Sequence, residues 1–205
     1  MMNREPRFWK TTLLWGLALT LVFGFGAFVG EKYSGTCMFI LMPYFAAIAV
    51  TLPIVFLGRF GAGLATYLPY AVLGFAPLFY FDWLQSHALR GLWAVIVWAA
   101  SGPLIGLCAD LAYSLAARLA ERWRAAAAGA AVQAATFAVM LLGLTLLYVD
   151  PSGADSHVRL FDTYWYFTAP WMIANGAFGG FTAAAFRQAA RRRTPAASSR
   201  ARARP

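Results

Sequence analysis

Residues 102–119 read GPLIGLCADLAYSLAARL, an apolar stretch that contains one carboxylate, Asp110, and reaches a basic residue, Arg118, near its end. The stretch belongs to a longer apolar run, residues 91–117, which exceeds the ~20 residues that cross a bilayer as a helix. A membrane-spanning helix is therefore expected here, and the single acid within it needs an explanation.

The composition of the chain also favours lipid as the surrounding solvent. Of the 205 residues, 61% are hydrophobic and 12% are charged. An ordinary soluble domain carries about 25% charged residues, so this chain lacks the polar residues that would coat a soluble core of its size. The basic residues flank the apolar runs, and nucleic-acid binding is therefore not expected despite the net charge of +9.

The apolar residues fall into six runs, which are residues 11–30, 37–57, 60–81, 91–117, 125–149 and 164–186. Each run is continuous, without the alternation of a strand, and lipid requires every backbone polar group to be satisfied within the segment. The sequence therefore predicts an all-α, polytopic membrane protein with a bundle of six transmembrane helices in residues 1–190. The first run is too long for a signal peptide and no small-residue cleavage site follows it, so an uncleaved first span is expected.

The distribution of Lys and Arg sets the expected orientation. All but three of the 17 basic residues fall on the side that holds both termini, and the exceptions are Lys32, Arg90 and Arg159. Basic residues are retained in the cytoplasm, and an even number of spans also puts both termini on one side. Because Ala and Arg are abundant, we expect a multi-pass protein of the bacterial cytoplasmic (inner) membrane with both termini cytoplasmic.

The last segment, residues 191–205, reads RRRTPAASSRARARP and contains almost nothing apolar. Such a segment cannot bury enough surface to fold, so a disordered basic cytoplasmic tail is expected. Contact with anionic membrane lipid is the favoured role for this tail. Binding to a partner protein is the alternative.

The spacing around Asp110 predicts where its side chain points, because positions four apart share one face of a helix. Small residues occupy this face, namely Gly102, Gly106 and Ser114. Small residues let a second helix approach closely, so Asp110 is expected to face the interior of the bundle. Two interpretations stay open: a structural one, in which the acid pairs with Arg118, bonds to Ser114 or reaches toward the interface, and a functional one in transport, proton transfer or substrate binding.

Two further glycine pairs have the same four-residue spacing and are expected helix-packing sites. They are Gly26 with Gly30, and Gly176 with Gly180.

The outer side carries both histidines and most of the acids. If the protein binds a solute, the expected pocket is lined by Asp82, Trp83, His87, His157, Trp165 and Asn175. An aromatic belt at the membrane interface, with solvated loop residues, is the alternative for most of these positions. For Asn175, a hydrogen bond to a neighbouring helix is favoured over lining a solute cavity.

Catalytic and metal-binding spacings are missing from the sequence. There is no G-x-S-x-G, Walker A or H-E-x-x-H motif. The histidines and carboxylates of the outer side have a suitable chemistry for a divalent metal but no ligand spacing. We therefore predict no enzyme activity, no metal site and no cofactor.

Residues 169–192, APWMIANGAFGGFTAAAFRQAARR, form an apolar segment with an Asn-Gly step, small residues and a basic end. Together with the six runs and the cytoplasmic termini, this segment resembles the closing helix of the substrate-binding S-components of energy-coupling factor transporters. The resemblance implies a pocket for a vitamin- or metal-type substrate near the outer face. It also implies that the first helices dock on a transmembrane coupling subunit, which works with ATPases.

Two functions are therefore expected. The first is an integral membrane component of a small-solute uptake system that captures substrate near the outer face. The alternative is an accessory or assembly subunit of a larger membrane complex, without transport activity of its own.

Overall fold

The computed structural model describes residues 5–32, 35–74, 92–147 and 165–193, and each of these segments is built from helices. In chain order the helices are α1 (Glu5–Lys32), α2 (Gly35–Leu57), α3 (Ala62–Pro69), the π-helical turn η2 (Tyr70–Gly74), α5 (Leu92–Leu115), α6 (Glu121–Leu147) and α8 (Trp165–Arg193). The predicted all-α class is confirmed for this part of the chain.

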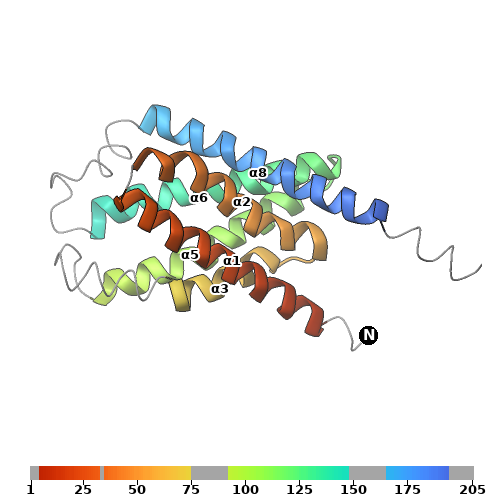
Figure 1. The fold of residues 1–205 in the computed structure, drawn as a ribbon, viewed down its shortest axis with the longest axis horizontal. Helices are drawn as coiled ribbons and strands as arrows, with labels where there is room; N and C mark the ends of the chain where they lie inside the picture. The colour runs from red at the N-terminus through yellow and green to blue at the C-terminus, as the bar shows by residue number, and fades with distance from the viewer. Residues whose placement is uncertain (1–4, 33–34, 75–91, 148–164, 194–205) are drawn as a thin grey trace, which may run out of the picture.

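The helices lie side by side in one elongated bundle (Figure 1). The first turn of α1, the α2–α3 connection, the α5–α6 connection and the last turn of α8 all lie at the same end of it. We call this end the arginine end, because its described residues include Arg7, Arg59, Arg118, Arg122, Arg124, Arg187 and Arg191. Of the basic residues that the sequence assigns to one side, those within the described segments are thus brought together in space.

Within the described residues, the third apolar run forms the short helix α3 and the turn η2, and residues 75–81 of the run lie outside them. Between α2 and α3 the chain reverses within residues 58–61, where Gly58 and Gly61 have positive φ angles of 60° and 89°. Only glycine adopts this backbone region without strain, so these two residues make the sharp connection possible. α3 then covers eight residues before the helix changes to the π-helical turn η2.

Close contacts between backbones hold the bundle together. A Cβ added to Gly180 or Gly176 on α8 would overlap a carbonyl of α6, that of Ala125 or Gly129 respectively. A Cβ on Gly63 of α3 would lie 2.5 Å from the carbonyl oxygen of Gly106 on α5. The α6–α8 and α3–α5 pairs can therefore form only because these positions carry no side chain.

The interior of the bundle is mainly apolar, with a core that includes Leu19, Ile54 and Tyr67, and it also holds several polar side chains, while other large apolar side chains face outward. Buried polar residues include Thr12, Thr51, Thr66, Asp110 and Gln133. On the outside, Leu21 of α1 is 72% exposed and Leu115 of α5 is 85% exposed. The outer face of α8 likewise exposes Phe178 and Phe186. Large apolar side chains are therefore exposed on α1, α5 and α8.

By length and hydropathy, one helix within the described residues is able to cross a membrane. It is the segment Glu121–Leu142 of α6, with 22 residues and a mean hydropathy of 1.8, and 33% of its most apolar window is buried inside the bundle. Shorter apolar helical segments occur at Leu41–Leu57 and Ala62–Leu73. The helices themselves are thus a finding, whereas six membrane crossings remain a prediction.

The last helix continues beyond the predicted domain boundary at residue 190. α8 ends at Arg193, so the first three residues of the predicted disordered tail are helical. Arginine is a good helix former, and Arg191 also forms an ion pair with Glu121 of α6. Residues 194–205 lie outside the described part of the chain.

Candidate functional site

Asp110 lies in the interior of the bundle, where it caps another helix. Its side chain is 1% exposed, and its two carboxylate oxygens accept hydrogen bonds from the backbone N–H groups of Gly63 and Leu64, each at 3.1 Å. These N–H groups belong to the first turn of α3, where they have no partner within the helix. The N-cap residue of α3 is Gly61, which has no side chain to accept them. Asp110 therefore supplies from α5 the oxygen atoms that a Ser or Asp usually supplies from the N-cap position.

The glycine pair beside Asp110 explains why the acid reaches α3. Because Gly63 and Gly106 place the two backbones in contact, the first turn of α3 lies next to the Asp110 carboxylate. The negative charge also faces the positive end of the α3 dipole. Ser114, on the same side of α5, is exposed and donates to the backbone carbonyl of Asp110 at 2.8 Å, not to its carboxylate. This geometry favours the structural interpretation of Asp110.

The predicted outer-side pocket is only partly within the described residues. Asp82, Trp83, His87 and His157 lie outside them. Trp165 is exposed on the first turn of α8, where its ring packs edge-to-face against that of Tyr166. Gly26 and Gly30 lie on α1, in a part whose side-chain surroundings the structure does not describe.

The prediction that Asn175 bonds to a neighbouring helix was wrong. Its side-chain amide donates to the carbonyl of Trp171, one turn earlier on α8, at 3.0 Å. The amide between helices is instead Gln133 of α6, which is 2% exposed and donates to the carbonyl of Pro43 on α2 at 2.8 Å. Sequence reasoning missed Gln133, although a lone amide in the alanine-rich segment AAAAGAAVQAATF was the available signal.

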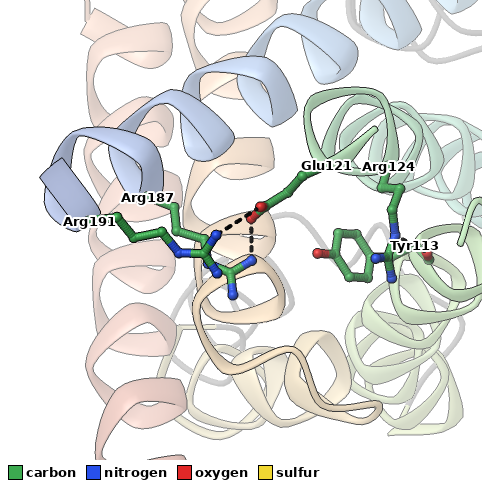
Figure 2. Close-up of polar contacts among 5 residues, drawn as sticks. All are labelled: Tyr113, Glu121, Arg124, Arg187 and Arg191. Carbon is green, nitrogen blue, oxygen red and sulfur yellow. Dashed lines mark hydrogen bonds and ion pairs between the residues drawn. The ribbon is translucent and has the colours of Figure 1, made fainter. Parts of the chain in front are cut away.

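An ion-pair network joins α6 and α8 at the arginine end. Glu121, on the first turn of α6, accepts a hydrogen bond from Arg187 and forms a 3.5 Å ion pair with Arg191 (Figure 2). Nearby, the Arg124 guanidinium lies 4.1 Å from the centre of the Tyr113 ring, and its Nε donates to the Tyr113 carbonyl at 3.3 Å. These contacts fix the positions of α5, α6 and α8 relative to one another at this end.

A cavity of about 260 Å³ opens beside this network. It is lined by Arg7 of α1, Phe56 of α2, and Arg187, Ala190 and Arg191 of α8. Three guanidinium groups and one carboxylate, that of Glu121, lie in or next to it, so the local charge is positive. The lining suits an anion, held by charge-assisted hydrogen bonds of the kind that guanidinium groups make to phosphate and carboxylate.

Within the residues that the structure describes, no group of three or more His, Cys, Asp or Glu side chains is placed to hold a metal ion. No protein-family model, curated protein or solved structure matched the chain.

Proposed function

We propose that the chain is a six-span protein of the bacterial cytoplasmic membrane, with both termini in the cytoplasm, and that it is an integral membrane component of a small-solute uptake system. The membrane part of the proposal depends on one observation, which is the burial of polar side chains together with the outward exposure of large apolar ones. Thr12 and Asp110 are inside while Leu21, Leu115 and Phe178 are outside. Lipid is the solvent in which this arrangement has a low free energy.

The orientation is supported by the gathering of arginines at one end. Nine of them belong to the described residues of that end, including Arg192 and Arg193 in the last turn of α8. Arginines next to apolar helices are held on the cytoplasmic side during membrane insertion. The arginine end is therefore assigned to the cytoplasm in this proposal, and the outer-side residues of the predicted pocket to the opposite face.

The direction in which the glycine stripes face favours solute uptake over an accessory role. An accessory subunit that binds a larger complex through small residues needs such a stripe on its lipid-facing surface. The stripes whose surroundings are described face other helices of the same chain: Gly106 contacts Gly63, and Gly176 and Gly180 contact α6. The proposed capture site is the outer-side set of carboxylates, imidazoles and aromatic rings.

The test is purification of the tagged full-length chain from its native membrane in mild detergent, with identification of both bound proteins and bound small molecules. We expect a transmembrane coupling subunit and an ATPase pair in the eluate, and a solute that is released on denaturation. The double variant Trp83→Ala, His87→Ala should lose the solute. The control Trp9→Ala changes an exposed tryptophan near the arginine end and should retain it. Recovery of an unrelated large complex, with no solute in any sample, would contradict the uptake function and support the accessory role.

A further inference from the structure

The cavity at the arginine end combines positive charge with an apolar wall. Arg7 approaches it from α1, and Arg187 and Arg191 approach it from α8 one turn apart. Phe56, at the end of α2, contributes an aromatic ring that is partly exposed. A ligand that fits this lining carries a negative group beside an apolar segment.

Glu121 holds the guanidinium group of Arg187, which is mostly buried, and forms a longer ion pair of 3.5 Å with Arg191, whose side chain is 61% exposed. Its carboxylate contacts Arg187 and Arg191 from the α6 side, opposite α1 (Figure 2). A guanidinium group has five N–H donors, so an arginine that holds one carboxylate can also donate to a second acceptor. Pre-positioned donors bind an anion with a smaller loss of conformational freedom than flexible surface side chains do.

We propose that this cavity binds the phosphate group of an anionic phospholipid from the cytoplasmic leaflet. The proposal rests on the membrane placement given above, which puts the cavity at headgroup level. Anionic lipid attracts clustered arginines at this level of the membrane. The ring of Phe56 then lies where the glycerol and the upper acyl chains of the lipid pass, and a free phosphate ion has no apolar part to occupy that wall.

The experiment is a titration of the purified full-length chain in detergent with phosphatidylglycerol, and separately with phosphatidylcholine of the same acyl chains, read by native mass spectrometry. We expect preferential binding of phosphatidylglycerol. Arg7→Gln and Arg191→Gln should each weaken it by about tenfold, because each variant loses a charge-assisted hydrogen bond to the lipid phosphate, which contributes ~1.5 kcal/mol or more. The control is Arg122→Gln, since Arg122 is exposed and lies over the Trp123 ring, 6.0 Å from its centre and not in the cavity lining. The affinity of the Arg122→Gln variant for phosphatidylglycerol should equal that of the wild type.

Equal binding of the two lipids, or equal affinity of the two cavity variants and the wild type, would overturn the proposal. Displacement of the lipid by an equal concentration of inorganic phosphate would assign the cavity to the free ion and would overturn the lipid assignment. If the variants fail to fold, the wild type carries the test: its affinity for phosphatidylglycerol should fall as salt rises, and a salt-independent affinity contradicts the proposal. The solubility of the chain without detergent is measured first, before any lipid is added. A chain that stays in solution without detergent refutes the membrane placement.

Discussion

Replacing Asp110 with leucine should lower the free energy of unfolding by roughly 2–6 kcal/mol. Two buried N–H groups, those of Gly63 and Leu64, would lose their acceptor, and each unsatisfied buried group costs ~1–3 kcal/mol. Asp110→Asn should cost about half as much, because an amide keeps one acceptor oxygen and places an N–H₂ group against the second N–H. The measurement is the thermal unfolding of the purified variants in detergent, followed by circular dichroism.

The matched control for this prediction is Ser114→Ala. Ser114 shares the side of α5 with Asp110 but is exposed and bonds only to a helical carbonyl. Its removal should change stability by no more than about 0.5 kcal/mol. If Asp110→Leu were as stable as the wild type, the capping role would be refuted. If Asp110→Asn kept full stability and yield but lost uptake, the acid would act in transport instead.

The second large effect is expected at the contact between α6 and α8. Gly180→Val places a branched side chain where the Ala125 carbonyl of α6 lies. The two helices must move apart, and the neighbouring contact between Gly176 and Gly129 is lost with them. Since overpacking alone costs ~1–3 kcal/mol, the combined loss should reach about 3 kcal/mol or more. We expect little folded protein in the membrane fraction, measured as detergent-extracted monomer by size-exclusion chromatography.

Ala185→Val is the control for this substitution. Ala185 lies on the same helix but is exposed, so the added methyl groups meet no backbone. Its yield should match that of the wild type. Equal yields of folded Gly180→Val and Ala185→Val would mean that the close approach of α6 and α8 does not limit stability.

The helices could be predicted because their signal is local. Long continuous apolar runs can satisfy their backbone groups in lipid only as helices, so the run at 91–117 anticipates α5 without knowledge of its neighbours. The length of α3 could not be predicted in this way. It depends on the reversal at Gly58 and Gly61 and on the change to the π-helical turn η2, and neither has a signal in the periodicity of the run.

The partners of the polar side chains were harder to predict because they are distant in sequence. Four-residue spacing placed Asp110 in the interior, but its partners Gly63 and Leu64 are 47 and 46 residues away. The two amides illustrate the same limit. Asn175 reaches a carbonyl of its own helix, whereas Gln133 reaches another helix. The bond of Gln133 depends on the relative position of α2 and α6, which no local sequence pattern predicts.

The arginine-end network had a partial sequence signal. In the sequence Glu121 lies among basic residues, next to Arg122, but nothing local selects Arg187 and Arg191 as its partners. The cavity beside it is formed by α1, α2 and α8 together. Because the cavity is formed by helices that are distant in sequence, no local sequence pattern predicts it.

Membrane topology is best tested with a pair of reporter fusions. A fluorescent protein that folds only in the cytoplasm should fluoresce when fused after Pro205, and alkaline phosphatase, which folds only in the periplasm, should be active when fused after Asp155. This pair of results is what six crossings with an inner arginine end require. A dark fusion after Pro205, an inactive phosphatase after Asp155, or a chain recovered in solution without detergent would contradict it.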